Sequence, residues 1–159
     1  MRLENKVALI TGGSRGQGAT EARLFAKEGA AVVIADILED AGKQLEAEIN
    51  EGGGRALFTR LDVTSEEDWQ RAIQETVSAF GKINVLINNA GIYARVSIEH
   101  TTLEDWNKIM DVNSTGVFLG TKTVIPAMRE AGGGSIINLS STAGLVGSAR
   151  GSAYGASKG

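Results

Sequence analysis

The sequence predicts an α/β protein in which a doubly wound parallel sheet carries helices on both faces. Three observations support this fold class. Short apolar runs alternate with longer amphipathic stretches along the chain. Glycines cluster where the amphipathic stretches end, as they do after helices. The 159 residues include 21 glycines but a single proline, a balance that suits repeated tight turns between regular elements rather than a disordered linker.

The apolar runs have the length and composition of strands that are buried on both faces. Such runs are typical of parallel sheets, because helices cover both sides of the strands. Four runs have this character, and a weaker fifth strand is expected over 55–61. The four stronger strands are predicted over 7–10, 31–35, 85–87 and 135–139.

Two helices are predicted from their first turns. Ser65 with Asp68, and Thr102 with Asp105, have the spacing of capping boxes, in which the hydroxyl accepts a backbone N–H and the acidic residue reaches back. Behind each cap, apolar side chains recur at helical spacing on one face. Strands and helices therefore alternate, and a last helix begins near Ser152. We expect one domain over residues 1–159.

Composition and charge disfavour several kinds of partner. Sixteen basic against 19 acidic residues give a net charge of −3, which does not indicate binding to nucleic acid. Without cysteine, the chain has neither a disulfide framework nor a thiolate metal site. No apolar run approaches the roughly 18 residues of a membrane span, and the first residues lead into a strand rather than a signal peptide. We expect a cytoplasmic protein with neither nucleic-acid nor membrane partners.

A glycine-rich loop connects the first predicted strand to the first helix. Its first glycine permits a tight turn, its second lets the backbone approach a pyrophosphate, and its third lets the helix pack near the strand. The N-terminus of the helix offers free N–H groups to phosphates. The position of the loop is the one that a dinucleotide-binding Rossmann fold requires. The residues expected to bind the cofactor there are Gly12, Ser14, Arg15, Gly16, Gln17 and Gly18.

Asp36 follows the second predicted strand, 18 residues beyond Gly18. A carboxylate at this point accepts hydrogen bonds from the adenosine ribose hydroxyls and repels a 2′-phosphate, which favours NAD over NADP. Arg15 has the opposite tendency, because a guanidinium pairs with a 2′-phosphate. We give Asp36 more weight because it should lie nearer the ribose. The alternative interpretation of Asp36 is a helix N-cap.

Tyr154 and Lys158 have the spacing Y-x-x-x-K, which on a helix places a phenol beside an ammonium group. A free phenol has a pKa near 10, and a nearby positive charge lowers it, so the phenol becomes a better base near neutral pH. Ser141 lies 13 residues before Tyr154, at the end of the fifth predicted strand. His100 precedes a helix cap, and we interpret it as a surface loop residue.

These motifs together resemble the short-chain dehydrogenase/reductase family. The loop T-G-x-x-x-G-x-G is followed in order by the acidic residue, D-V, N-N-A-G, Asn, Ser and Y-x-x-x-K. The resemblance implies that Asp62 and Val63 lie against the adenine ring. It also implies that the N-N-A-G element at 88–91 stabilises the central sheet. The residues of that element in the predicted cofactor site are Asn89, Ala90 and Gly91.

The resemblance also implies a catalytic set. Tyr154 exchanges a proton with the substrate oxygen, and Ser141 orients and polarises that oxygen. Lys158 lowers the pKa of the tyrosine and binds the nicotinamide ribose. Asn113 positions a water in the proton relay. Tyr154 and Lys158 thus belong to both the catalytic and the cofactor-binding sets, and no metal is required.

The implied function is hydride transfer between NAD(H) and a secondary alcohol or ketone. The stretches 116–128 and 132–137 look like those of bacterial hydroxysteroid and cyclic-alcohol dehydrogenases, so the substrate is expected to be steroid-like, a cyclic alcohol or a sugar. A 3-oxoacyl carrier-protein reductase that uses NADPH shares the same catalytic residues and remains the alternative. A non-catalytic NAD-binding protein is the alternative from another class. A methyltransferase has no need of Ser141, Tyr154 and Lys158 together.

Members of this family run to roughly 250 residues in one domain. We therefore expect this chain to be incomplete at its C-terminus, without the last two strands and the substrate loop. The fifth strand would then be an uncovered sheet edge. The resemblance further implies a homo-oligomer, a tetramer or dimer, for the full-length protein. We expect residues 1–159 alone to lack dehydrogenase activity, because a short terminal helix is marginal in water.

Overall fold

The centre of the computed structural model, which describes residues 1–159, is a five-stranded parallel sheet. Its strand order is β3-β2-β1-β4-β5, so the chain crosses from one edge to the other side of β1 after β3. The carboxyl ends of β1 and β4 therefore lie side by side at a switch point, where open α/β sheets bind ligands. The strands are β1 (Val7–Thr11), β2 (Ala31–Asp36), β3 (Arg55–Arg60), β4 (Val85–Asn88) and β5 (Ser135–Asn138).

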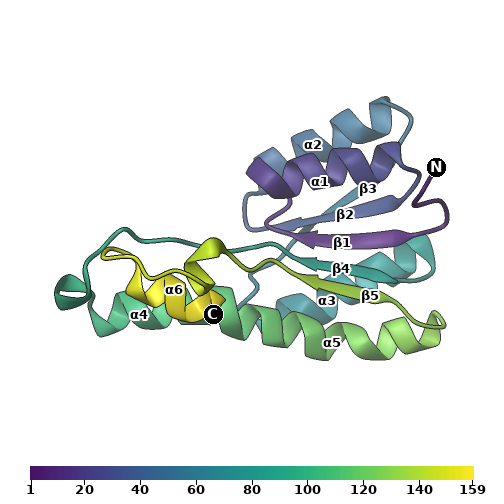
Figure 1. The fold of residues 1–159 in the computed structure, drawn as a ribbon. Coiled ribbons are helices and arrows are strands. Elements are labelled where there is room, and N and C mark those ends of the chain that lie inside the picture. Colours follow the sequence, from purple (N-terminus) through teal and green to yellow (C-terminus); the bar gives the residue numbers. More distant parts are fainter.

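Helices cover both faces of the sheet, which confirms the predicted doubly wound fold (Figure 1). One face carries α1 (Gly16–Lys27) and α2 (Glu39–Glu51), and the other carries α3 (Glu66–Phe80) and α5 (Gly116–Glu130). None of these helices combines the length and apolar character that crossing a bilayer requires.

Beyond the carboxyl ends of the strands, α4 (Leu103–Met110) and α6 (Ser152–Lys158) form a lobe that projects from the sheet (Figure 1). A π-helical turn, Asp111–Thr115, joins α4 to α5. Two 3₁₀ turns, Ile98–His100 and Thr142–Gly144, lie in the loops that lead to α4 and α6.

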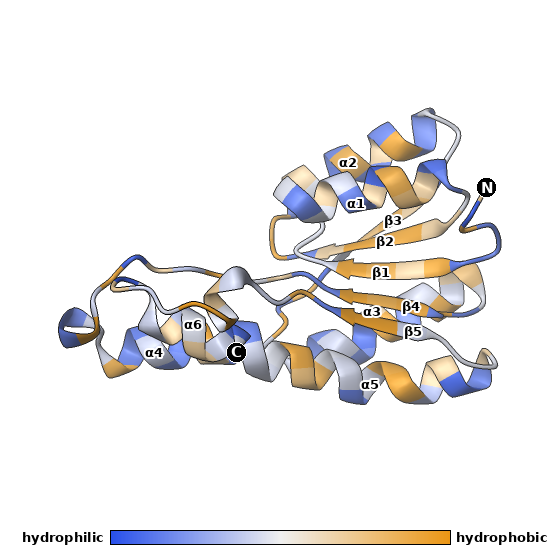
Figure 2. Ribbon diagram, in the orientation of Figure 1, coloured by the Kyte–Doolittle hydropathy of each residue, from blue (hydrophilic) through white to orange (hydrophobic).

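The apolar strands lie between two layers of helices, and an apolar core fills the space on each face of the sheet (Figure 2). On the side of α3 and α5, Trp69 is fully buried and its indole N–H donates to the Val63 carbonyl at 2.9 Å. A Cβ on Gly120 would lie 2.5 Å from the Trp69 ring, so a side chain at this position of α5 would separate the two helices. The predicted apolar face of α3 is confirmed, since its side chains form much of this layer.

The prediction that all four strong strands are buried on both faces is wrong for the last one. The strands β1, β2 and β4 are buried throughout, but β5 is largely exposed, and Ile137 keeps 39% of its surface accessible. The physical reason is position: β5 pairs only with β4, so it forms the sheet edge that was expected for it.

Both predicted N-caps are confirmed, and at the second the Asp105 carboxylate reaches back to accept the Thr102 hydroxyl at 2.7 Å. The Ser65 and Thr102 hydroxyls accept the N–H groups of Asp68 and Asp105 at 3.1 and 3.0 Å. Asp68, however, does not reach back to the cap. Its carboxylate instead accepts the Asp62 N–H at 2.9 Å and bonds from two guanidinium groups, which are stronger donors than a backbone N–H.

Candidate active site

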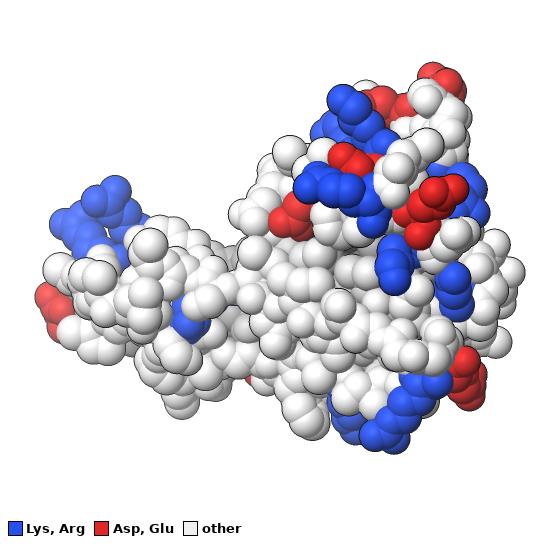
Figure 3. All heavy atoms as spheres, turned by 45° about the vertical axis from the view of Figure 1, so that its right-hand side comes forward, with Lys and Arg blue, Asp and Glu red and all other residues white.

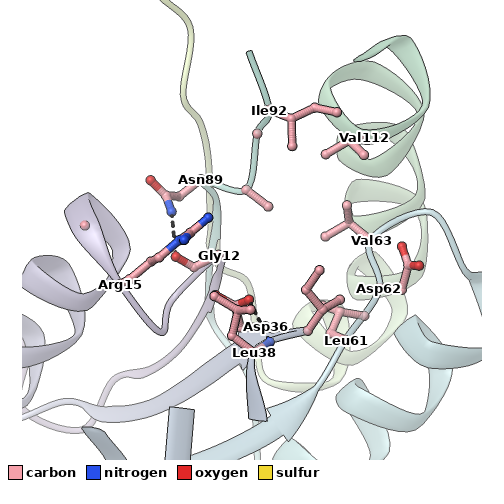
Figure 4. A pocket seen from close by; sticks show the side chains of 14 residues that line it. Gly12, Arg15, Asp36, Leu38, Leu61, Asp62, Val63, Asn89, Ile92 and Val112 are labelled. Atoms are coloured by element: carbon pink, nitrogen blue, oxygen red, sulfur yellow. Dashed lines mark hydrogen bonds between the residues drawn. The ribbon is translucent and has the colours of Figure 1, made fainter. Parts of the chain in front are cut away.

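A cavity of about 370 Å³ opens at the carboxyl ends of β1, β2 and β4. Figure 4 shows Arg15 and Asn89 on one side of it, Asp36 at its base, and Asp62 and Val63 opposite. Most of the predicted cofactor residues meet here although they come from four separate loops. Those that line the cavity are Gly12, Arg15, Gly16, Asp36, Asp62, Val63, Asn89, Ala90 and Gly91.

The glycine loop is packed against the sheet on one side and open on the other. A Cβ on Gly18 would lie 2.3 Å from the Gly12 carbonyl oxygen, so only glycine permits this approach of α1 to the loop. At Gly16, by contrast, a Cβ would meet no atom within 4 Å, and the backbone has φ +56°. The first N–H groups of α1 have no acceptor in the chain, and Gly16, where the helix begins, lines the cavity.

The glycine loop is bound to the loop after β4 by hydrogen bonds that the sequence analysis did not predict. The Thr11 hydroxyl, buried at the end of β1, accepts the N–H groups of Asn89 and Ala90 at 3.1 and 3.0 Å. The Asn89 amide donates in return to the carbonyls of Thr11 and Gly12 at 2.8 and 3.2 Å. The loop after β4 and the loop after β1 are thereby locked together, which fixes one wall of the cavity.

Asp36 anchors the glycine loop to the end of β2. Its two carboxylate oxygens accept the N–H groups of Ser14 at 3.0 Å and Leu38 at 3.1 Å. The alternative interpretation of Asp36 as a helix N-cap is wrong, since α2 begins at Glu39 and Leu38 is its N-cap. Each oxygen retains a lone pair for a further donor, so the same carboxylate is able to orient the loop and to accept ligand hydroxyls.

The far wall of the cavity is set by Asp62 and Val63 after β3. The Asp62 carboxylate accepts both the N–H and the hydroxyl of Thr64, and its own N–H donates to Asp68 at 2.9 Å. Burial works to raise the pKa of Asp68, but hydrogen bonds from the Asp62 N–H and the Arg71 guanidinium outweigh it and hold that pKa below its ordinary value. The first turn of α3 thus fixes this loop through an ionised carboxylate.

Asn113 occupies the π-helical turn between α4 and α5 and is almost fully buried. Its Oδ1 accepts the Ile92 N–H at 2.8 Å, and its Nδ2 donates to the Ile92 carbonyl at 2.9 Å and to the Ser157 hydroxyl at 3.0 Å. The side chain therefore joins the segment after β4 to α6. The wider π turn interrupts the α-helical spacing at Asn113, and such turns are frequent at functional sites.

Tyr154 and Lys158 lie on the short helix α6, with the Lys158 ammonium 6.0 Å from the centre of the Tyr154 ring. The ammonium donates to the Leu139 carbonyl at 2.6 Å, and burial lowers the pKa of Lys158. The Ser140 hydroxyl donates to the Lys158 carbonyl at 2.8 Å. These contacts, with Asn113, tether a seven-residue helix that is too short to be stable alone.

Ser141 ends the segment that leads from β5 toward α6. Its hydroxyl oxygen accepts the Ala143 N–H at 3.1 Å, which caps the following 3₁₀ turn. The hydroxyl hydrogen remains free to donate. The Tyr154 hydroxyl makes no hydrogen bond within the chain, so the two hydroxyls are not joined to each other and each has capacity for a ligand.

Gly91 connects the cavity with the residues of α6. A Cβ at Gly91 would lie 3.4 Å from Asn113 Oδ1 and 3.7 Å from Lys158 Nζ. Three of the predicted cofactor residues in the glycine loop do not line the cavity. Gly18 packs beneath the loop, the Gln17 amide donates to Glu21, and the Ser14 hydroxyl is buried without a partner. Tyr154 and Lys158 lie beyond Gly91, outside this cavity.

Several lining residues were absent from the sequence prediction. They are apolar side chains that follow the strand ends or face them from the helical lobe, namely Ile37, Leu38, Leu61, Ile92 and Val112. Their sequence signal is weak, because an apolar residue near a strand end or within a helix has the same pattern whether it lines a cavity or belongs to the core. They supply an apolar surface suited to a flat ring.

The chain is similar in sequence to several curated dehydrogenases. The chain is 50% identical to trans-4-hydroxycyclohexanecarboxylate dehydrogenase of Sinomonas cyclohexanicum, with 99% of the chain and 62% of the relative covered. It is 48% identical to 3-alpha-(or 20-beta)-hydroxysteroid dehydrogenase of Mycobacterium tuberculosis, covering 99% and 59%. It is 44% identical to cyclopentanol dehydrogenase of Comamonas testosteroni, covering 99% and 63%.

The chain thus spans about three fifths of the length of these curated relatives. The family model for short chain dehydrogenase matches residues 6–159, which include the glycine loop, the strand ends that form the cavity, and α6. The chain belongs to the short-chain dehydrogenase family.

Proposed function

We propose that the protein binds NAD(H) in the cavity at the strand ends and oxidises a secondary alcohol, or reduces the corresponding ketone, beside α6. One observation carries this proposal. Gly91 lines the cavity and is also the close neighbour of Asn113 and Lys158, so the cavity leads directly to the Y-x-x-x-K helix. A dinucleotide that lay along the cavity would bring its far end to Tyr154.

The residues present fit a dinucleotide. The open side of Gly16 and the unpaired N–H groups of α1 suit a pyrophosphate, because a helix N-terminus attracts anions. Asp36 has lone pairs for ribose hydroxyls, and the apolar side chains near Val63 suit an adenine ring. When bound, the nicotinamide supplies the hydride chemistry of the reaction.

The catalytic roles proposed for this chain are proton transfer and orientation. Tyr154 holds or moves the proton at the substrate oxygen, and Ser141 donates a hydrogen bond to that oxygen. Lys158 supplies the positive charge that stabilises a phenolate. Asn113 is a positioning residue in this structure, because its amide ties Ile92 to Ser157 and thereby sets the position of α6.

NAD is proposed as the preferred cofactor over NADP. The Asp36 carboxylate lines the base of the cavity, where its charge repels a 2′-phosphate. Arg15 also lines the cavity but is exposed, so its charge is screened by solvent and its side chain is free to turn away. The buried carboxylate therefore outweighs the exposed guanidinium.

The proposed substrate class is a cyclic secondary alcohol. The relatives described above carry names that refer to hydroxylated cyclohexane, cyclopentane and steroid rings. The exposed ring of Tyr93 next to Tyr154, with centroids 4.9 Å apart, offers an aromatic edge against which such a ring is able to pack.

The test is Tyr154→Phe in the complete protein, a substitution that removes one oxygen and little packing. We expect turnover of a panel of cyclic alcohols, followed by NADH absorbance, to fall by more than a thousandfold. NADH binding, followed by fluorescence, should change less than threefold. The matched control is Tyr93→Phe, which loses only the hydrogen bond to the Arg150 carbonyl and should cost about tenfold or less. Substantial turnover by Tyr154→Phe would refute the proposed mechanism.

A further inference from the structure

A second cavity, of about 600 Å³, lies on the other side of the helical lobe from the strand ends. It is formed where the loop between β4 and α4 meets the segment that precedes α6. None of its lining residues lines the cavity at the strand ends, so it is a separate feature of the surface.

The second cavity carries an excess of positive charge. Arg95 and Arg150 both line it, and neither guanidinium lies within 4.0 Å of a carboxylate. Glu99 is the single acidic residue in its lining, and its carboxylate lies 4.0 Å from His100 rather than near an arginine. Figure 3 shows a cluster of basic side chains at the end of the molecule opposite α1 and α2, with acidic atoms below it.

His100 adds a further donor to the same cavity. The Ser97 hydroxyl lies 2.8 Å from His100 Nδ1, so this nitrogen is already engaged and the other ring nitrogen is left for a ligand. Two arginines without an ion pair and one histidine thus line one open space. Unpaired arginines of this kind suit oxyanions, because a guanidinium binds a carboxylate or phosphate through two parallel hydrogen bonds.

Tyr93 connects this cavity with Tyr154. Its ring packs edge to face against the Tyr154 ring, and its hydroxyl donates to the Arg150 carbonyl at 2.9 Å. A Cβ at Gly151 would lie 3.2 Å from the Tyr93 ring, so the two segments are in close contact. Tyr93 therefore links the ring of Tyr154 to the backbone of the segment that carries Arg150.

We propose that the substrate carries an oxyanionic substituent, a carboxylate or a phosphate, that Arg95 and Arg150 bind while its hydroxyl-bearing carbon lies at Tyr154. This inference rests on the proposed function for the position of the reacting hydroxyl. The binding of the anion itself does not depend on that function. The arginines act as specificity residues: they select charged over neutral ring alcohols and take no part in proton transfer.

The first experiment measures binding without turnover. Cyclohexanecarboxylate and cyclohexyl phosphate have no hydroxyl to oxidise, and neutral cyclohexanecarboxamide is their control. We expect calorimetric titration to show at least one anion binding fivefold or more tightly than the amide, and the better anion identifies the substituent. In Arg95→Gln/Arg150→Gln this preference should vanish. Arg129→Gln, which removes an exposed unpaired arginine at the far end of α5, should retain it.

The second experiment measures turnover of 4-hydroxycyclohexane-1-carboxylate and its neutral amide by the complete protein. We expect kcat/KM to favour the carboxylate by at least tenfold, mainly through KM, and the double variant to abolish the ratio. Turnover of neither compound together with a retained anion preference in binding would refute the proposed function but not the anion site. Equal binding of both anions and the amide, or a preference that survives in the double variant, would overturn the anion site.

Discussion

Replacing Gly18 by alanine tests how the glycine loop is held. A Cβ at this position would lie 2.3 Å from the Gly12 carbonyl oxygen and 2.7 Å from Asn89 Nδ2. Since both atoms belong to the locked pair of loops, neither is free to rotate away. Overpacking of this kind costs about 1–3 kcal/mol. The higher helix propensity of alanine offsets this cost by up to about 1 kcal/mol.

The strain must be relieved by moving α1 away from the loop. This movement breaks the bonds from the Asn89 amide to the Thr11 and Gly12 carbonyls, each worth about 0.5–1.5 kcal/mol. Overpacking, the two lost bonds and the gain in helix propensity together predict that Gly18→Ala lowers the free energy of unfolding by about 1–6 kcal/mol. NADH affinity should fall at least tenfold, because the displaced N–H groups no longer converge on the pyrophosphate.

The assay combines urea denaturation with a fluorescence titration of NADH. Gly147→Ala is the matched control, since a Cβ there meets no atom within 4 Å and the residue has no left-handed backbone conformation. It should leave stability and NADH affinity close to those of the unsubstituted protein. If Gly18→Ala behaves like Gly147→Ala in both measurements, the account of the locked loops is wrong.

Two other substitutions test charge. Asp36→Asn should shift the ratio of kcat/KM for NAD and NADP toward NADP by roughly a hundredfold, because a carboxylate repels a phosphate charge about 5 Å away by about 3 kcal/mol at an effective dielectric constant of about 20. Asp68→Asn should lower the free energy of unfolding at pH 7 by about 1–3 kcal/mol. Because folding lowers the pKa of Asp68, its stabilisation is present above the ordinary pKa and is lost as the pH falls further. The difference should therefore shrink below about pH 4.

The outcomes that contradict these two predictions are distinct. An unchanged cofactor ratio in Asp36→Asn, measured beside kcat/KM of Glu39→Gln as an exposed control, would show that the carboxylate does not select the cofactor. A stability difference in Asp68→Asn that stays constant from pH 7 to pH 3 would show that its ionised form does not hold the loop after β3.

The sequence was sufficient for the fold class because its signals are local. A run of apolar residues such as 31–35 has to be buried on both faces wherever it lies, and only a parallel sheet covered by helices buries several such runs. Glycines fixed the turns for the same reason, since the constraint at Gly18 follows from the absence of one atom. The prediction for β5 failed because burial of a strand depends on its neighbours, which composition does not record.

Only the tertiary structure determines which distant residues meet at the candidate site. Thr11 looks like an ordinary strand residue in the sequence. It binds Asn89, which lies 78 residues further along the chain, only because β1 and β4 are paired in the sheet. The π turn at Asn113 exists within an uninterrupted helical pattern, where local propensity gives no sign of it. Arg95 and Arg150 share a cavity because the loop between β4 and α4 meets the segment that precedes α6. Sequence patterns report what each segment buries, whereas a site depends on which segments meet, and that is set by packing between residues far apart in the chain.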